Sequence, residues 1–389
     1  MRSFVSLIAT SLLLASNSFA QGPSPWAGGP PGNGAAAAHA VDPLASNHWS
    51  ASPGPAMPPN NGAGGGGWRP FGNPPSAGGP GGSGGQGGGM PGMPGMPGGG
   101  ASGPTQGGGE SQLKQESDFP GQPTKAVLYS YVPKSFKKGN AVVVALHHCG
   151  GSAPGFFTEH PDWAKMADQK GFLLLFGGSP EGSPEGSKGC WDVSSKASLK
   201  HDGGGDTQTV VNMVKFAQKK YGASDKVYIF GQSSGAMMSQ ALSAVYPDVF
   251  VAAAAFSGVP AGCFKTDKAI GPDWNNTCTG GTLNEPTQYW VQQAKDMYPG
   301  YTGKYPRMLL VHGDQDAIIN FNNHREATKQ WCGLHGFDAE KPTQKRPLNT
   351  LPNYEMSKYG SAAVTAISAK GVTHDNPAKA DLTCEFFGI

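Results

Sequence analysis

The segment KVYIFGQSSGAMMSQAL, residues 226–242, constrains the fold more than any other stretch of this chain. An apolar run is followed directly by the frame Gly231-Gln-Ser233-Ser-Gly235 and then by a helix-forming run. Glycines on both sides of a serine allow a strand and a helix to approach closely, so that the serine lies on a sharp turn. A second match to the frame, GGSGG at residues 81–85, has no strand before it and no helix after it, and we treat it as low complexity. The sequence therefore predicts a strand, a tight turn at Ser233 and a helix.

Apolar, β-branched runs alternate with segments of helical period after this chain's first third. This alternation is typical of an α/β protein with a mostly parallel sheet and helices on both faces. The clearest helix is expected at 205–222, where Val210, Val214 and Ala217 share one face and Gly222 ends the helix. The expected strands lie at 126–133, 141–148, 172–178, 226–231, 249–258, 307–313 and 362–368.

The N-terminal part of the chain has a different composition. Residues 1–20 place Arg2 ahead of a short apolar run and end in small residues, which is the pattern of a secretory signal peptide. Half of the 60 glycines and half of the 34 prolines lie before residue 118, and residues 21–118 show no helix or strand period. We expect 21–118 to be a disordered Gly/Pro-rich spacer. Residues 119–389 are then expected to be one globular domain of a secreted, extracellular protein without a membrane anchor.

Charge and cysteine content limit the possible partners. The formal net charge is +2 and Lys and Arg do not cluster, so nucleic acid is not an expected partner. The six cysteines lack the C-x-x-C spacing of zinc sites, and no metal is expected. The short loop between them favours a disulfide from Cys263 to Cys278. Asn275 heads a sequon and is a candidate glycosylation site. The remaining cysteines are expected to pair as Cys149 with Cys190 and Cys332 with Cys384.

A serine hydroxyl becomes a nucleophile only when a base removes its proton, and an acid must hold that base in the right tautomer. In the α/β-hydrolase fold these groups follow one another as Ser, Asp or Glu, and His. His324 and His335 lie within or at the end of an expected helix, where solvated or capping roles fit them better. His374 follows the last expected strand on a loop. We therefore predict Ser233 as the nucleophile and His374 as the base.

The acid should follow a strand between these two residues. The run RMLLVHGDQD ends in Asp314 and Asp316, which compete for the role. A loop needs a few residues to turn back over the sheet edge, which favours Asp316, and Asp314 then serves as a turn residue.

An oxyanion hole is expected from two backbone N–H groups. In this fold one comes from the residue after the nucleophile, here Ser234, and the other from the turn after an early strand. That turn reads ALHHCGG, so the second donor is His148 or Cys149.

The motifs together resemble the secreted carbohydrate esterases of family one. This group includes fungal acetylxylan esterases and feruloyl esterases and is related to extracellular polyhydroxybutyrate depolymerases. The resemblance covers nearly all of 119–389 and none of the spacer, and it implies an α/β-hydrolase fold with Ser233 as nucleophile, Asp316 as acid and His374 as base. The motifs that carry it are VVVALHHCGG, CWDV, GGGDTQTVVNMVKFA, VYIFGQSSGAMMSQALSAVYPDVFVAAAAFSGVP, YPRMLLVHGDQD and GVTHDNP.

Several positions depart from that family's pattern or extend it. The family usually has L-H-G-C where this chain has Leu146-His147-His148-Cys149. The side chain of His148 therefore replaces a glycine beside the expected oxyanion turn. Asp206 stands where a glutamate is frequent. Trp191 matches an aromatic residue near the site in relatives and is a candidate substrate-binding residue; the alternative is a packed tryptophan beside a disulfide.

The expected activity is hydrolysis of a carboxylic ester through an acyl enzyme, with no cofactor. Acetylxylan is the first expected substrate, feruloylated arabinoxylan the second and a polyester the third, and loops at 179–205 and 261–305 would shape the pocket. The expected partner is thus an esterified plant cell-wall polysaccharide, met by a monomer. The alternative from another class is a non-catalytic wall or matrix protein whose spacer is the working part.

Overall fold

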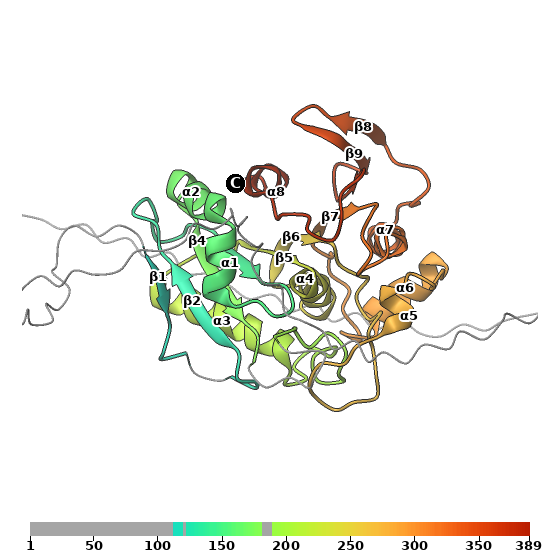
Figure 1. The fold of residues 1–389 in the computed structure, drawn as a ribbon. Coiled ribbons are helices and arrows are strands. Elements are labelled where there is room, and N and C mark those ends of the chain that lie inside the picture. The colour runs from blue at the N-terminus through green and yellow to red at the C-terminus, as the bar shows by residue number, and fades with distance from the viewer. Residues whose placement is uncertain (1–111, 120–121, 181–188) are drawn as a thin grey trace, which may run out of the picture. The chain divides into compact units, whose positions relative to one another are not determined.

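The computed structural model describes residues 112–119, 122–180 and 189–389 of the chain (Figure 1). The expected signal peptide at 1–20 lies outside the described residues, as does all but the end of the expected spacer at 21–118. In the part of the chain that is described, no helix is both long and apolar enough to cross a membrane.

The described residues form a single ten-stranded sheet with the strand order β1-β2-β4-β3-β5-β6-β7-β10-β9-β8. Each run that the sequence predicted as a strand is a strand of this sheet. The six neighbouring strands from β4 to β10 in this order pair in parallel, whereas the outer pairings at both edges are antiparallel. The strands are β1 Leu113–Gln115, β2 Val127–Tyr131, β3 Val142–Leu146, β4 Leu173–Gly178, β5 Val227–Gln232, β6 Phe250–Phe256, β7 Arg307–Gly313, β8 Gln344–Leu348, β9 Leu351–Tyr359 and β10 Val364–Ala369.

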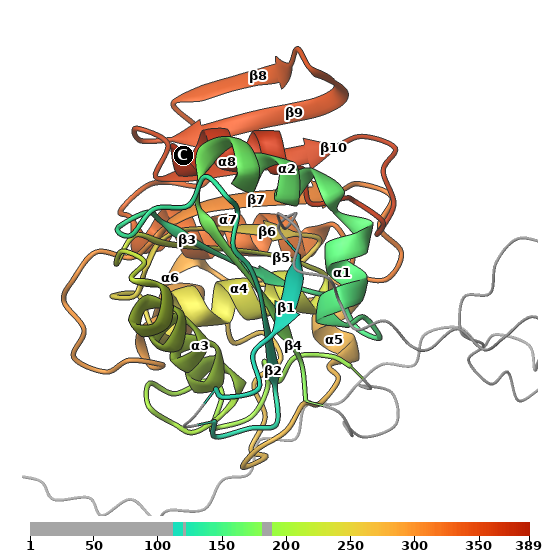
Figure 2. The same cartoon turned by 90° about the vertical axis from the view of Figure 1, so that its left-hand side faces the viewer.

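Helices cover both faces of this sheet (Figures 1 and 2). Apolar residues of α3, α4, α6 and α7 join one buried cluster with one face of the strands, and those of α1, α2 and α8 join a second cluster with the other face. The helices are α1 Ala153–Glu159, α2 Pro161–Lys170, α3 Asp206–Tyr221, α4 Ser234–Val245, α5 Asn276–Thr279, α6 Thr287–Lys295, α7 Asn322–Leu334 and α8 Ala380–Phe387. As predicted, Gly222 ends α3 in a left-handed conformation with φ 68°.

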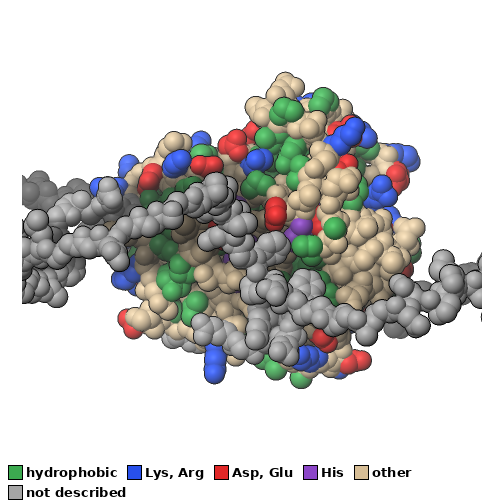
Figure 3. All heavy atoms as spheres, viewed as in Figure 1, with side chains coloured by type: hydrophobic (Ala, Val, Ile, Leu, Met, Phe, Trp, Pro, Cys, Tyr) green, Lys and Arg blue, Asp and Glu red, His purple; other side chains and the backbone are tan. Residues whose placement is uncertain are grey.

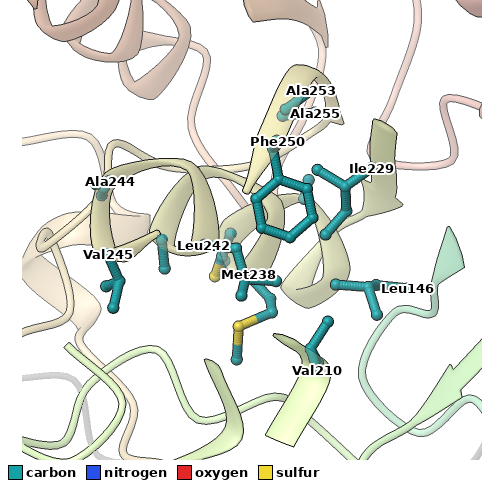
Figure 4. Packing of buried hydrophobic residues seen from close by; sticks show 14 of the residues in the cluster. Leu146, Val210, Ile229, Met238, Leu242, Ala244, Val245, Phe250, Ala253 and Ala255 are labelled. Carbon is teal, nitrogen blue, oxygen red and sulfur yellow. The ribbon is translucent and has the colours of Figure 1, made fainter. Parts of the chain in front are cut away.

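The central strands are buried on both sides, which explains their continuous apolar sequences. In β3, Val144 and Leu146 belong to the first cluster, and Val143 and Ala145 belong to the second, because successive side chains of a strand point to opposite faces. Figure 4 shows Leu146 together with other residues of the first cluster, from α3, α4, β5 and β6. This packing fixes the carboxyl ends of β3 and β5, from which the site described below is built.

The two edges of the sheet were not predicted. β1 pairs with β2, and Glu116 just after β1 is buried and bonded to Lys220 and Tyr221 of α3. The sheet thus includes residues that precede Phe119, where the sequence analysis placed the start of the domain. At the opposite edge β8 and β9 form an antiparallel pair whose β8 residues are mostly exposed and include Pro347. Such a polar run with a proline gives no strand signal, because only an edge strand tolerates it.

Two of the three expected disulfides are confirmed, and the third is wrong. Cys149 is bonded to Cys190 and Cys263 to Cys278. Cys332 and Cys384 are free and buried. Cys332 belongs to the cluster beneath α7 and Cys384 to the cluster beneath α8, so the sheet lies between them. A disulfide requires the two Cα atoms to be within about 7 Å, and residues on opposite faces of a sheet are too far apart for that.

Candidate active site

Ser233 occupies the turn between β5 and α4 in a strained conformation. Its φ of 53° and ψ of −118° place it among the few non-glycine residues with positive φ. A Cβ atom at Gly231 would collide with the backbone of Gly235, and one at Gly235 would collide with the carbonyl of Leu146. Both glycines of the frame are therefore required by the close approach of β5, α4 and β3.

Ser233, His374 and Asp316 form a continuous hydrogen-bonded chain. The His374 Nε2 atom lies 2.9 Å from Ser233 Oγ, and its Nδ1 atom lies 2.7 Å from Asp316 Oδ2. The three residues come from the carboxyl ends of β5, β7 and β10, which meet at one edge of the parallel sheet. This arrangement can pass a proton from the serine hydroxyl to an imidazole whose other nitrogen is held by a carboxylate.

Asp316 is surrounded by donors. Its Oδ1 atom accepts the N–H groups of Ile318 at 2.9 Å and Ile319 at 2.7 Å, and its Oδ2 atom also lies 3.1 Å from His312 Nε2. Burial alone would raise the pKa of Asp316, but hydrogen bonds from His312 and His374 outweigh burial and hold the pKa well below its usual range. Asp316 is therefore ionised at neutral pH.

His312 is a site residue that the sequence analysis missed. The side chain is 2% exposed, and its Nε2 atom also lies 2.9 Å from the Ile319 carbonyl. Its N–H therefore bridges Asp316 and the loop that follows it, which fixes the plane of the carboxylate. The signal for it was its place at the end of β7, four residues before Asp316, in the segment HGDQD.

The competing candidates lie elsewhere. Asp314 Oδ1 accepts the N–H of Gly371 at 2.7 Å, which is the turn role expected of it. His324 packs beneath the site with its ring 6.0 Å from that of His312, and burial lowers its pKa to about 3. His335 lies at the end of α7, and its Nε2 atom is 3.0 Å from the carbonyl of Pro306.

The turn after β3 lies beside the start of α4. Ser234 is the first residue of α4, so its N–H has no acceptor within the helix. Its hydroxyl lies 3.5 Å from the His147 carbonyl, which places this turn, with His148 and Cys149, next to the nucleophile position. His148 and Cys149 thus remain candidates for the second oxyanion donor.

His147 holds that turn from below. Its Nε2 atom accepts the N–H of Ser179 at 3.0 Å, so the proton of the neutral ring is on Nδ1 and is donated to the His148 carbonyl at 2.7 Å. Burial lowers the pKa of His147 to about 4, and the ring is therefore neutral at neutral pH. His147 is a structural residue of the turn.

Trp191 does not fit its predicted role as a substrate-binding residue. The side chain is 1% exposed and donates its indole N–H to the His147 carbonyl at 3.1 Å. It packs beside the Cys149–Cys190 disulfide, which was the alternative reading of the sequence. In the structure its buried ring supports the turn after β3.

Asn275 has a structural role at its position. Its side-chain oxygen accepts the N–H of Cys278 at 3.0 Å and caps α5, and its nitrogen lies 3.3 Å from the Cys263 carbonyl. The half-buried amide is therefore engaged at both ends. Glycosylation at Asn275 stays a prediction.

Asp206 is the first residue of α3 and has a buried carboxylate. The carboxylate is 2% exposed, and its Oδ2 atom accepts the N–H of Asp192 at 3.0 Å. Burial is the main cause that raises the pKa of Asp206 to about 6, and the nearby Asp192 adds to it. The folded state thus binds a proton more tightly at this group than the unfolded chain does.

We expect Asp206→Asn to become more stable than the wild type as pH rises. Because the folded pKa is raised, ionisation costs stability progressively between about pH 4 and pH 6, and an amide avoids that cost. The advantage should grow from near zero at pH 4 to on the order of 2 to 3 kcal/mol above pH 6. Urea unfolding of both proteins at several pH values measures it. Buried His147 and His324 titrate in the opposite sense, so only the difference between the proteins is informative.

The exposed Asp225 provides the control for this experiment. Asp225→Asn should shift the free energy of unfolding by a similar small amount at every pH. An advantage of Asp206→Asn that is independent of pH would contradict the assignment of the raised pKa.

Among the described residues, no group of three or more His, Cys, Asp or Glu side chains is arranged to hold a metal ion.

Figure 3 shows the surface from the same side as Figure 1. Histidine side chains are visible on it, with hydrophobic and acidic side chains beside them.

Comparison with known proteins agrees with this geometry. The signature of the family described as esterase PHB depolymerase matches residues 127–348. Acetylxylan esterase A of Aspergillus ficuum is 40% identical over 278 residues, which is 71% of this chain and 89% of the relative. The acetylxylan esterase A of Aspergillus awamori matches equally well. The solved structure of an acetyl xylan esterase from Aspergillus awamori matches with a TM-score of 0.68 and 39% identity, over 71% of this chain and 99% of the other.

Proposed function

Since the chain belongs to the esterase PHB depolymerase family and is a carboxylic ester hydrolase with the α/β-hydrolase fold, we propose that it removes acetyl groups from xylan through an acyl enzyme. The observation that carries the proposal is the hydrogen-bonded chain from Ser233 through His374 to Asp316. The relatives named above, which are acetylxylan esterases, support the choice of substrate.

In the proposed mechanism Ser233 Oγ attacks the carbonyl carbon of the ester while His374 Nε2 takes the hydroxyl proton. The tetrahedral intermediate collapses, the sugar oxygen leaves, and the imidazolium returns the proton to it. Water then attacks the acetyl-serine with the same base, which releases acetate and restores the serine. Asp316 holds the proton on Nδ1 of His374 and stabilises the imidazolium.

The negative oxygen of the intermediate would be held by backbone N–H groups. Ser234 supplies one, and its free N–H at the start of α4 also has the favourable direction of the helix dipole. The turn at His148 and Cys149 supplies the other. All of these steps use groups of this chain and water.

A xylan that carries both acetyl and feruloyl esters tests the substrate. We expect the protein to release acetate and little ferulate, because its named relatives act on acetylxylan. Chromatography of the released acids measures both products from one reaction. Ferulate in quantity would identify a feruloyl esterase.

The family's description favours a polyester as the second candidate, and hydroxybutyrate released from a polyhydroxybutyrate film would establish it. If no ester is cleaved, the non-catalytic wall or matrix protein becomes the better explanation.

We also propose that the protein is secreted and acts outside the cell as a monomer. The signal-peptide pattern at 1–20 and the two disulfides support export. The spacer at 21–118 would then tether or separate the catalytic domain. N-terminal sequencing of the secreted protein checks the cleavage site.

A further inference from the structure

His148 carries an imidazole at the turn where a glycine is usual, and that imidazole is bonded at both nitrogens. Its Nδ1 atom lies 2.9 Å from the Cys149 carbonyl, and its Nε2 atom lies 3.1 Å from Glu159 Oε2 at the end of α1. Both neighbouring oxygens are hydrogen-bond acceptors, and the ring lies between them. The pair therefore joins the turn after β3 to α1.

His160, which follows Glu159 in the chain, contacts the residue that precedes the nucleophile. His160 lies at the junction of α1 and α2, and its Nε2 atom lies 3.3 Å from Gln232 Oε1. Gln232 directly precedes Ser233. His160 is 9% exposed, and its ring packs edge-on against Phe156 with the centroids 4.5 Å apart. The ring of Phe156 also lies 6.4 Å from that of His148.

We propose that the junction of α1 and α2, residues Glu159 and His160, is a brace that sets the spacing between the oxyanion turn and Ser233. Glu159 holds the turn through His148, and His160 holds the nucleophile through Gln232. These are positioning residues. The inference rests on the proposed acyl-enzyme mechanism, because only that mechanism requires a fixed distance between a nucleophile and an oxyanion donor.

The fold explains why a brace is needed there. Leu146 of β3 lies opposite Gly231 of β5, so the turn and Ser233 begin two residues beyond a fixed pair of neighbouring strands. The disulfide to Cys190 and the bond from Trp191 hold the turn from one side. The His148 contact holds it from the side of α1. His148 and Cys149, the two candidate oxyanion donors of this turn, thus carry one attachment each.

Few charged side chains among the described residues lie near the pair of His148 and Glu159. Glu159 is 48% exposed at its side chain and His148 is 33% exposed, so the contact lies at the rim of the site. His147 lies beneath it and is neutral at neutral pH, because burial lowers its pKa to about 4. Asp162 on α2 is 75% exposed and pairs with Lys165 of its own helix.

The test compares Glu159→Gln and Glu159→Ala with Asp162→Asn, a nearby carboxylate outside the brace. On 4-nitrophenyl acetate we expect both Glu159 variants to lower kcat roughly 10-fold to 100-fold with KM changed less than about twofold, because misplaced groups mainly raise the barrier. The Ki of phenylboronic acid, whose serine adduct places an oxygen in the oxyanion hole, should weaken by a similar factor. Asp162→Asn should match the wild type, and thermal unfolding should show that all variants fold.

A double variant checks that the two residues act through one contact. His148→Gln combined with Glu159→Gln should lose no more activity than the worse single variant, because the effects of interacting residues do not add. Additive losses, Glu159 variants equal to Asp162→Asn, or a change in KM alone would overturn the brace. A wild type that neither hydrolyses the ester nor binds the boronic acid would remove the proposed function itself.

Discussion

Ser233→Ala is expected to lower kcat for a soluble acetate ester by about 10⁵-fold to 10⁶-fold, the loss typical when a nucleophile of this kind is removed. Without Oγ no acyl enzyme forms, and His374 can only assist a direct attack by water. Steady-state hydrolysis of 4-nitrophenyl acetate and release of acetate from acetylxylan measure the loss. A fluorophosphonate probe should label the wild type and leave the variant unlabelled.

The variant should keep its fold, which makes the result interpretable. Alanine at a φ of 53° is no more strained than serine, since both carry a Cβ atom, and the Ser233 N–H still donates to the Phe256 carbonyl at 2.9 Å. Ser243→Ala is a matched control, because it removes a buried hydroxyl that bonds to Ser239 on the same helix. We expect this control to keep nearly all activity. A Ser233→Ala protein with more than one hundredth of the wild-type rate would mean that another residue is the nucleophile.

The arrangement of the candidate site could be predicted because it follows from strand order. Ser233, Asp316 and His374 each follow a buried apolar run, and parallel strands place their carboxyl ends at one edge of the sheet. The choice between Asp314 and Asp316 needed only the length of loop required to turn back over that edge. Local composition and chain order were sufficient for these decisions.

The sequence does not show on which face of the sheet a side chain packs, and the features that depend on this could not be predicted. Cys332 and Cys384 each lie in a helix, and the sequence does not show which face of the sheet each helix covers. In the structure the sheet separates them. Trp191 could equally have faced substrate or core, and only packing against His147 decides it. The position of His312 at the end of a strand was an ambiguous signal, because a histidine at a strand end is as often structural as it is part of a site.

The contacts of His148 and Glu159 illustrate a further limit. The sequence shows that a side chain replaces glycine at the turn, but not where that side chain points. Its partner Glu159 is eleven residues away, at the end of α1, and the pairing follows from how α1 packs over β4 and β5. A substitution that appears to obstruct the turn in the sequence instead holds it in the structure.

Asp316→Asn is expected to lower kcat by about 10⁴-fold while leaving KM nearly unchanged. The carboxylate accepts two backbone N–H groups at Oδ1 and the His374 ring at Oδ2. An asparagine would keep its oxygen on the backbone donors and turn its NH₂ group toward His374. That group can only donate, so Nδ1 must become the acceptor and the proton moves to Nε2. The imidazole would then donate to Ser233 and could not remove its proton.

Asp314→Asn provides the comparison that assigns the acid. The Asn side chain keeps an oxygen that can accept the Gly371 N–H, so we expect activity within about twofold of the wild type. Both variants should be measured on the same ester across pH 5 to 9, with thermal unfolding to show that each is folded. Since the pKa of Asp316 is held well below its usual range, protonation of this group should not limit the wild type anywhere in that interval. A severe loss in Asp314→Asn with a mild one in Asp316→Asn would transfer the acid to Asp314, and the hydrogen bond between His374 and Asp316 would then have only a structural meaning.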